Sequence, residues 1–211
     1  MPSMLIIAIA GGTASGKSTV AEKVADLINS SNGTSPIVSI MSADWYYKCL
    51  RRLTHQQRAT WNFDEPNAID WELMQVHMEE LRQGKSIMTP RYDFNTHTRC
   101  DRGVVLAPTP IVILDGIMIF HDPDFREIFD YRVFVDVDER SRFLRRLKRD
   151  TADRGRTPRS VKEQWDATVQ PGHDLYVEPV KGCAHTTIKD GGFNDAAIRA
   201  LTAQIVAMHE S

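Results

Sequence analysis

The chain has 211 residues, of which 26 are Lys or Arg and 28 are Asp or Glu, so its formal net charge is −2. This length suits one α/β domain with a small insertion, and the near-neutral charge excludes a global basic field for binding nucleic acid or a membrane surface. The three cysteines, Cys49, Cys100 and Cys183, form no Cys-x-x-Cys pair, which argues against a disulfide framework or a zinc site. Reduced thiols and the lack of a bilayer-length apolar stretch lead us to expect a cytoplasmic protein.

A glycine-rich stretch near the N-terminus lies between a predicted strand and a predicted helix. Residues 4–10 are almost wholly apolar, which is typical of a parallel strand buried on both faces and not of a signal peptide. Residues 19–28 carry apolar side chains at spacings of four and three, which predicts a helix. The stretch between them matches Gly-x-x-x-x-Gly-Lys-Ser/Thr and consists of Gly11, Gly12, Thr13, Ala14, Ser15, Gly16, Lys17, Ser18 and Thr19.

This strand, loop and helix together predict a phosphate-binding loop. Glycines let the backbone curl around phosphate oxygens, while the helix N-terminus directs backbone N–H groups at them. Lys17 can reach the outer phosphates, and the Ser18 hydroxyl can ligate Mg²⁺. The alternative is a glycine-rich turn that binds nothing, which the flanking elements disfavour.

A second strand is predicted over residues 37–41, after a cluster of turn-forming residues. Asp44 stands just past its end. Because ligands of open parallel sheets lie beyond the carboxyl ends of the strands, we expect Asp44 to face whatever the phosphate loop holds. The alternative is an ordinary helix cap, since Asp is favoured there.

Residues 45–67 show weak periodicity and are expected to form irregular cover over a site. Asn67 is predicted to cap a helix that ends at Gly84. The apolar side of that helix is predicted to carry Leu73, Met74, Val76, Met78 and Leu81.

A protruding hairpin is predicted over residues 86–108, where two short extended runs flank a polar and aromatic middle. Its tip carries Tyr92, Phe94 and His97. These three rings suit a planar ligand that forms hydrogen bonds. The alternative is that the rings pack the hairpin onto the body of the protein.

Residues 111–114 are predicted to form another buried strand, and Asp115 follows it directly. An apolar strand that ends in a carboxylate is typical of the second metal-site element of phosphate-loop enzymes. Residues 131–136 are predicted to form a further strand, and Asp138 to cap the next helix.

The helix after Asp138 is predicted to have an apolar and a basic face. The apolar face carries Phe143, Leu144 and Leu147. The basic face carries Arg142, Arg146 and Arg149, and the segment Arg154-Gly155-Arg156 follows. Residues 145–160 are therefore expected to form an arginine-rich lid that closes on transferring phosphates. The alternative is a solvated helix whose arginines pair with Glu139, Asp150 and Asp153.

The C-terminal part completes a single predicted domain over residues 1–211. A helix is expected over residues 161–169, ended by residues 170–172 with their Pro and Gly. A short strand is expected over 184–188. A last helix should dock on the sheet through Ile198, Leu201, Ile205 and Met208.

Several motifs along the chain together resemble those of the uridine kinases in the phosphoribulokinase/uridine kinase family. Phe-Asp-x-Pro at 63–66 and Tyr-Asp-Phe-x-x-His at 92–97 are more specific than the phosphate loop. The resemblance extends nearly end to end, through segments 11–19, 44–48, 62–66, 92–99, 115–117, 145–150, 154–156 and 168–171. It implies an α/β P-loop kinase fold, with a mainly parallel sheet flanked by helices.

The resemblance also implies roles for individual residues. Asp44 would be the base for a nucleoside 5′-hydroxyl, and Asp64 and Arg146 would hold the ribose hydroxyls. Lys17, Arg149 and Arg154 would serve the phosphates, while Ser18 and Asp115 would serve Mg²⁺. A pyrimidine pocket would be formed by Tyr47, Phe63, Tyr92, Phe94, His97, Arg156 and Gln164.

The resemblance implies that the function is ATP-dependent phosphorylation of uridine and cytidine. It also implies a homo-oligomer, commonly a tetramer, in which the hairpin contributes to the contacts between subunits. Asp115 replaces the family's usual Glu, and Gln170 stands where the family often has Lys or Arg. The first change shortens the reach to a metal by one methylene, and the second removes a basic group near the site. Ribulose 5-phosphate, pantothenate and nicotinamide riboside remain alternative acceptors, and a nucleotide-sensing module without turnover remains an alternative class.

Overall fold

The computed structural model describes residues 4–33 and 35–211, and a parallel sheet lies at its centre. The strand order is β2-β7-β1-β8-β9, and every neighbouring pair is parallel. The strands span Leu5–Gly11 (β1), Val38–Ser42 (β2), Ile111–Gly116 (β7), Tyr131–Asp136 (β8) and Thr186–Lys189 (β9). The predicted α/β class and the predicted strands of the sheet are confirmed.

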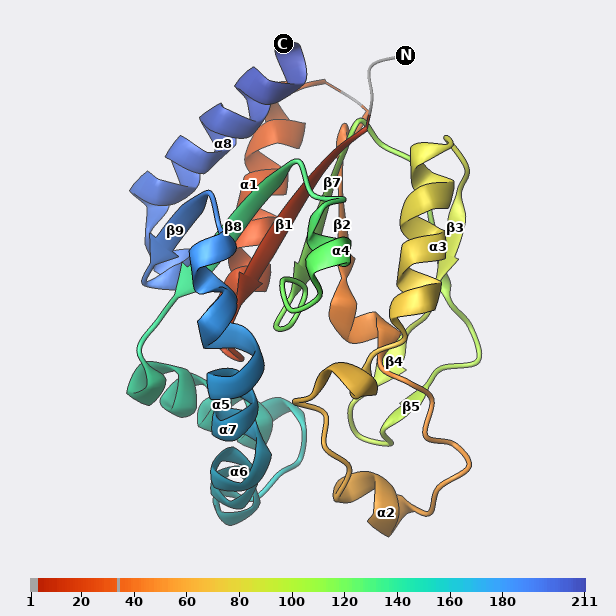
Figure 1. Cartoon of the computed structure of the whole chain (residues 1–211), viewed down its shortest axis with the longest axis vertical. Helices are drawn as coiled ribbons and strands as arrows, with labels where there is room; N and C mark the ends of the chain where they lie inside the picture. The colour runs from red at the N-terminus through yellow and green to blue at the C-terminus, as the bar shows by residue number, and fades with distance from the viewer. Residues whose placement is uncertain (1–3, 34) are drawn as a thin grey trace.

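Helices cover both faces of the sheet (Figure 1). On one face, α1 (Lys17–Ser31) packs beside α8 (Asp195–Glu210), and the alternate strand residues Ile7 and Ile9 join their core. On the other face, α3 (Trp71–Arg82) and α4 (Pro123–Arg126) share a core with residues Ile6 and Ala8 of the same strand. This alternation explains why β1 is apolar throughout, because each face of the strand meets a different layer of helices.

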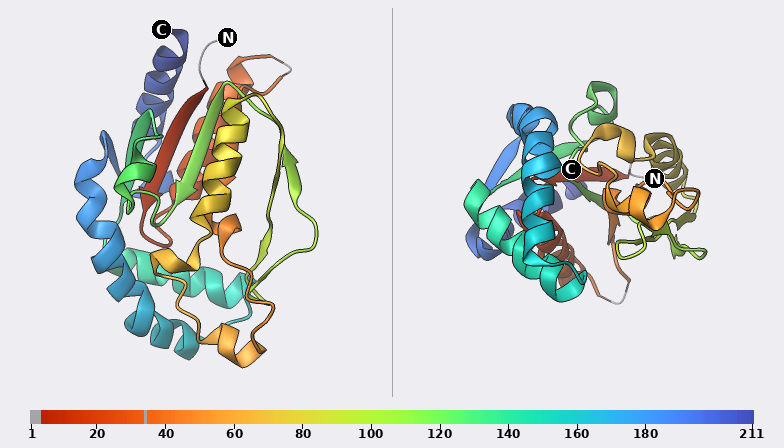
Figure 2. Two further views of the ribbon diagram at one scale, coloured as in Figure 1. Left: turned by 45° about the vertical axis from the view of Figure 1, so that its right-hand side comes forward. Right: turned by 90° about the horizontal axis from the view of Figure 1, so that it is seen from below.

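The carboxyl ends of the strands point to one end of the molecule, where further elements gather (Figures 1 and 2). On one side of this end lie α5 (Glu139–Asp153) and α6 (Pro158–Gln164). Opposite them lie α2 (His55–Ala59) and the hairpin tip. Short 3₁₀ turns at Ala43–Tyr46 and Pro66–Ala68 connect this part to the body.

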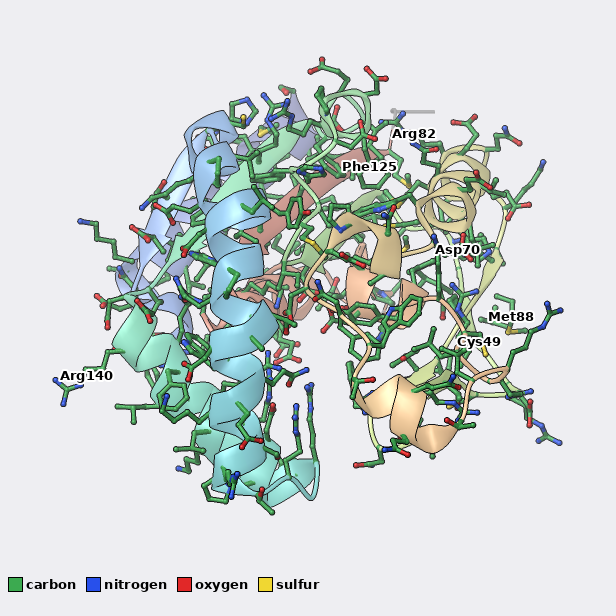
Figure 3. The ribbon with its side chains drawn as sticks, turned by 60° about the horizontal axis from the view of Figure 1, so that its bottom comes forward. Cys49, Asp70, Arg82, Met88, Phe125 and Arg140 are labelled. Carbon is green, nitrogen blue, oxygen red and sulfur yellow. The ribbon has the colours of Figure 1, made fainter. Side chains whose placement is uncertain are left out.

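The predicted hairpin is present and consists of two successive ladders. The ladder at the base of the hairpin pairs β3 (Ile87–Thr89) with β6 (Val104–Leu106), and the ladder at its tip pairs β4 (Tyr92–Asp93) with β5 (Thr98–Arg99). Arg99 fastens the tip to the body, since its guanidinium donates to the Tyr47 carbonyl at 2.9 Å and to Asp70 at 2.9 Å. Met88 points away from the body on the outer side (Figure 3) and is exposed.

The start of α3 differs from the prediction. Its cap is Asp70, whose carboxylate accepts from the Leu73 N–H at 3.2 Å, and the helix ends at Arg82. Asn67 lies instead in the preceding 3₁₀ turn, and Val76 is exposed. The predictions of Asn67 as the cap and of Val76 on the apolar side were both wrong. The 3₁₀ turn at Pro66 makes the helix begin later, and this start determines which of its sides packs on the core.

The helix after α6 also differs from the prediction, because it does not end at Pro171. It continues through a π-helical segment at Trp165–Val169, α7 (Gln170–Gly172), a second π-helical segment at His173–Val177 and a 3₁₀ turn at Glu178–Cys183. The wider π turns shift the hydrogen-bond register around Pro171, which has no N–H to donate. Gly172 serves close packing instead, since a Cβ there would lie 2.3 Å from the Asp64 carbonyl oxygen.

Helix α5 buries a polar stripe, so the alternative of a solvated basic face is excluded for Arg142 and Arg146. Its buried residues are Arg142, Arg146 and Asp150, whereas Leu144 is 52% exposed. The reason is its position: α5 lies across the carboxyl ends of the strands, against the phosphate loop, where Arg145 donates to the Ser15 carbonyl at 3.3 Å. Within 4–33 and 35–211, we find no helix with the length and apolar character needed to cross a membrane.

Candidate active site

The phosphate loop connects β1 to α1 with the backbone shape that its glycines permit. Gly16 precedes the helix with φ +93°, a left-handed conformation that glycine adopts without steric cost. Gly11 also has no room for a side chain, because a Cβ would lie 2.6 Å from the Val135 carbonyl oxygen. The Ser15 N–H donates to the Gly12 carbonyl at 3.1 Å and closes the loop. Lys17, the first residue of α1, is buried beneath this loop.

Two oxygen ligands of the kind that Mg²⁺ prefers lie together at the base of the loop. The Ser18 hydroxyl donates to the Asp115 carboxylate at 2.5 Å, so Asp at this position is long enough to reach Ser18. Burial raises the pKa of Asp115, and the Lys17 ammonium opposes that rise. No group of three or more His, Cys, Asp or Glu side chains within the described residues could hold a metal. A Mg²⁺ ion here would therefore take ligands from a bound phosphate and water as well.

A cavity of about 450 Å³ opens between the phosphate loop, the hairpin tip and the helices α5 and α6. Its volume lies in the range of small-molecule sites. Every residue predicted to be catalytic or to bind the acceptor lines it. These are Lys17, Asp44, Tyr47, Phe63, Asp64, Tyr92, Phe94, His97, Arg146, Arg149, Arg154, Arg156 and Gln164. Residues as far apart in the sequence as Thr13 and Gln164 thus meet in one cavity.

One end of this cavity is aromatic. Phe63 and His97 stack with ring centroids 5.0 Å apart and an interplanar angle of 22°. Tyr47 contacts Phe63 edge-on at 5.4 Å and Tyr92 at 5.3 Å, while the Phe94 ring meets Tyr92 at 5.5 Å. Burial raises the pKa of both tyrosines, which keeps their hydroxyls neutral. The rings therefore pack on one another and line the cavity, so the two interpretations of the hairpin aromatics are compatible.

The next part of the wall is a carboxylate held beside an arginine. Asp64 is 7% exposed, and its Oδ2 accepts from the Thr168 hydroxyl at 3.0 Å. Burial raises the pKa of Asp64, and the nearby Arg146 guanidinium and the Thr168 hydroxyl oppose that rise. Arg146 donates to the Thr13 hydroxyl at 3.0 Å and to Gln164 at 2.9 Å. Arg156 also donates to Gln164, so two cations converge on one amide oxygen.

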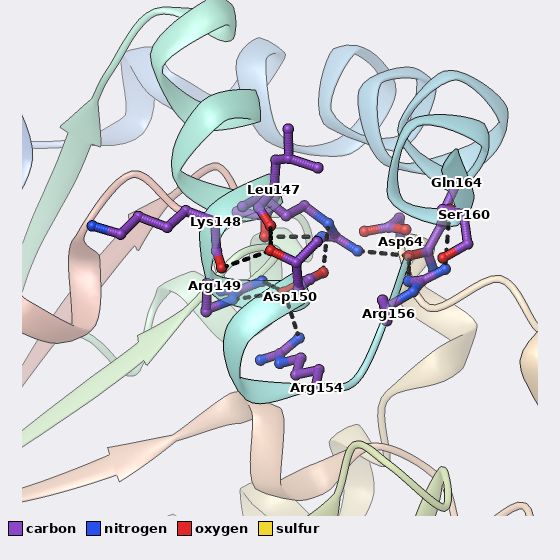
Figure 4. A network of polar contacts seen from close by, with 12 residues as sticks. Asp64, Leu147, Lys148, Arg149, Asp150, Arg154, Arg156, Ser160 and Gln164 are labelled. Carbon is purple, nitrogen blue, oxygen red and sulfur yellow. Dashed lines mark hydrogen bonds and ion pairs between the residues drawn. The ribbon is translucent and has the colours of Figure 1, made fainter. Parts of the chain in front are cut away.

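Asp150 joins three arginines of the wall (Figure 4). Its carboxylate lies 2.8 Å from Arg149, 3.3 Å from Arg146 and 3.6 Å from Arg154. The Arg154 guanidinium in turn lies 4.1 Å from the centre of the Phe94 ring on the hairpin. In the alternative interpretation of the sequence, Asp150 was an ion-pair partner on a solvated helix, but it is 1% exposed and lines the cavity. Periodicity could not have found this role, because it does not show which side of a helix faces a cavity.

A second cavity, of about 510 Å³, adjoins the phosphate loop on the side of α1 and was missed from the sequence. Phe193, 80% exposed, borders it, and the Arg145 guanidinium lies 5.1 Å from its ring centre. Gly191 allows this segment to approach the loop, since a Cβ there would lie 2.1 Å from the Ser15 carbonyl oxygen. The Gly-Gly pair after the last strand was the available signal. Lys17 and Arg149 line both cavities and so mark the place where they meet.

Gln170, which replaces a basic residue of the family pattern, lies beside a buried cation. Its Oε1 accepts from Arg142 at 3.1 Å, and its Nε2 donates to Asp174 at 2.8 Å. The Arg142 side chain packs directly against the phosphate loop, since a Cβ at Gly12 would lie 2.9 Å from it. A positive charge is therefore present near position 170, although a different residue supplies it.

The parallel sheet, the phosphate loop and the arginine-lined cavity define the class of P-loop kinases. Residues 6–197 match the model of the phosphoribulokinase/uridine kinase family, and the chain belongs to this family. It is a phosphotransferase, and the predicted family is confirmed.

Curated relatives support this assignment, and a solved structure shares the fold. A uridine kinase of Deinococcus deserti is 40% identical over 200 residues, which cover 95% of this chain and 94% of the relative. A uridine kinase of Lactobacillus helveticus is 39% identical over 201 residues, covering 95% and 93%. A structure described as a possible uridine kinase from Bacillus stearothermophilus superposes with a TM-score of 0.62 at 18% identity, covering 89% of this chain and 90% of the other. That last similarity confirms the P-loop kinase fold.

Proposed function

We propose that the protein is an ATP-dependent nucleoside kinase that phosphorylates the 5′-hydroxyl of uridine and cytidine, yielding UMP and CMP in pyrimidine salvage. The observation that carries the proposal is the meeting of two cavities at Lys17 and Arg149. One cavity contains the aromatic rings and Asp64, which suit a nucleoside. The other borders the phosphate loop and suits the donor. The curated relatives named as uridine kinases support the same acceptor.

The donor would occupy the second cavity. Its phosphates would lie on the N–H groups of the loop and the start of α1, where the helix dipole favours negative charge. Its purine base would lie against Phe193, an exposed ring that offers a stacking surface. Mg²⁺ bound by Ser18 and Asp115 would neutralise charge on the donor phosphates. Lys17 and Arg149, where the cavities meet, would stabilise the charge that spreads over the transferring group.

Asp44 would orient the acceptor hydroxyl and accept its proton. It lies in the 3₁₀ turn that directly follows β2 and lines the acceptor cavity together with Lys17. In phosphoryl transfer the protein mainly positions the reactants and stabilises charge, so a base aimed at the hydroxyl and cations aimed at the phosphoryl group suffice. Arg154 would add a further cation from the opposite wall once both substrates are bound.

The acceptor would place its ribose at Asp64 and its base among the aromatic rings. A carboxylate accepts hydrogen bonds from two vicinal hydroxyls, which ribose supplies. The amide of Gln164 and the guanidinium of Arg156 suit the carbonyl and amino groups of a pyrimidine edge. We expect purine nucleosides to be poor acceptors, because a two-ring base would overfill a space bounded by Phe63, Tyr92 and His97.

The test is a product assay with ATP, Mg²⁺ and one candidate acceptor at a time. Uridine and cytidine should give monophosphates with the highest kcat/KM. A higher value for ribulose 5-phosphate, pantothenate or nicotinamide riboside would contradict the acceptor. ATP binding without product from any acceptor would favour a nucleotide-sensing module instead, although such a module needs neither Asp44 nor an arginine clamp.

A homo-oligomer, with the tetramer as the expected form, is part of the same proposal. The β3–β6 ladder supports it, since Met88, Val104 and Val105 are exposed apolar side chains on a segment that stands off the body. Light scattering on the purified protein should give a mass above 23.9 kDa, and Val105→Asp should lower it. A monomer at micromolar concentration would contradict the proposal.

A further inference from the structure

Asp150 is a buried carboxylate of α5 that interacts with several arginines in the wall of the acceptor cavity. It is 1% exposed and forms ion pairs with Arg146, Arg149 and Arg154. One carboxylate therefore faces three guanidiniums, and the set keeps two formal positive charges. The Asp44 and Asp64 carboxylates line the same cavity and offset part of this charge at longer range. Asp150 is the carboxylate in ion-pair contact with all three arginines, and cations gathered beside a cavity in this way favour the binding of an anion.

The three arginines reach three different parts of the cavity. Arg146 donates to Thr13 of the phosphate loop and to Gln164 of α6. Arg149 lines both cavities, at their junction. Arg154 lies over the Phe94 ring of the hairpin tip, 4.1 Å from its centre. The carbonyl oxygen of Asp150 also accepts from the Arg156 N–H at 3.1 Å, which fixes the turn after α5.

We propose that Asp150 is a positioning residue that holds Arg146, Arg149 and Arg154 in place until the donor phosphates replace it as their anionic partner. This inference rests on the proposed function of the arginines in phosphoryl transfer. Before binding, Asp150 offsets part of their mutual repulsion and sets their geometry. When a polyphosphate binds, Arg149 and Arg154 exchange a carboxylate for phosphate oxygens, and Asp150 then keeps Arg146 aligned with the ribose side.

The proposal predicts opposite effects of one substitution on anion binding and on turnover. In Asp150→Asn the competing negative charge is gone, so the arginines should bind a polyphosphate more tightly, by about threefold or more. The same guanidiniums are no longer held in a productive arrangement, so kcat should fall by about tenfold or more. If Asp150 had only a structural role, Asp150→Asn would bind polyphosphate more weakly than wild type, because the arginines would be less ordered.

The experiment measures two quantities on the full-length protein: tripolyphosphate affinity by calorimetry, and kcat with uridine and ATP. Asp26→Asn is the matched control, since it removes the same charge from an exposed side chain of α1 that lines neither cavity. The control should change each quantity by less than about twofold. Melting curves of all variants show whether they are folded.

Asp150→Glu covers the case in which the Asn variant does not fold. It keeps the charge, so tripolyphosphate affinity should stay within about twofold of wild type. Its extra methylene displaces the arginines, so kcat should still fall. An unchanged kcat in either folded variant, or weaker tripolyphosphate binding by Asp150→Asn, would overturn the role of Asp150. Absence of turnover in the wild type would refute the proposed function alone, because the tripolyphosphate titration does not depend on an acceptor.

Discussion

Removing one ribose hydroxyl from the acceptor tests the site at its most constrained point, the Asp64 carboxylate. Asp64 is 7% exposed, and Gly172 packs against its backbone so closely that a Cβ would lie 2.3 Å from its carbonyl oxygen. The side chain therefore has little freedom to find another partner or water. If the 2′-hydroxyl or the 3′-hydroxyl donates to Asp64, its loss leaves a buried charged acceptor without that hydrogen bond.

The magnitude follows from this burial. A buried polar group left unpaired costs about 1–3 kcal/mol, which corresponds to a loss of about 5- to 160-fold in kcat/KM. We expect 2′-deoxyuridine to show a loss in this range relative to uridine. Asp64→Asn should reduce the discrimination between the two nucleosides, because a neutral amide forms the weaker hydrogen bond.

The pH dependence supplies a second measure of the same interaction. Burial raises the pKa of Asp64, so the ionised form that binds the ribose is lost at a higher pH than for an ordinary Asp. The kcat/KM for uridine should therefore fall as the pH drops through this raised pKa. In Thr168→Val the hydrogen bond that lowers the pKa of Asp64 is gone, so the acid limb should move to still higher pH. Profiles measured with uridine at saturating ATP would show the shift.

The reasoning fails if 2′-deoxyuridine and 3′-deoxyuridine are both used as well as uridine. It also fails if the acid limb of Thr168→Val moves to lower pH. Ser160→Ala, which changes another hydroxyl lining the same cavity but without contact to Asp64, serves as the control and should leave the ratio between uridine and 2′-deoxyuridine unchanged.

Three further predictions concern the reacting groups. Lys17→Met should lower turnover by about 10³-fold or more, because a charge beside the transferring phosphoryl group is lost, and steady-state rates within threefold of wild type would contradict the site. Asp44→Asn should lower kcat by about 10²- to 10⁴-fold with ATP affinity still measurable by calorimetry, whereas an unchanged kcat would exclude Asp44 as the base. Residues 145–160 should act as a lid, so trypsin cleavage near Arg154 should slow when an ATP analogue and uridine bind together, and equal cleavage with and without them would exclude closure.

The sequence by itself determined the sheet and the phosphate loop, because their causes are local. A strand that meets helices on both faces must be apolar along its length, which is how β1 and β7 were found. The loop glycines, Lys17 and Ser18 act within nine consecutive residues, so their spacing was enough. The motifs at 63–66 and 92–97 indicated the family, and the residues chosen from them all line one cavity.

Only the tertiary structure decided which side of α5 is buried and what Asp150 contacts. Periodicity shows that a helix has two faces, but it cannot show that the polar face is the buried one. That outcome follows from the placement of α5 across the carboxyl ends of the strands, where its neighbours are the phosphate loop and a charged cavity. The cavity bordered by Phe193 depends likewise on contacts over long sequence separation, between Gly191 and Ser15. The helix that passes Pro171 shows the same limit, because π turns and close packing on Asp64 override a local signal to stop.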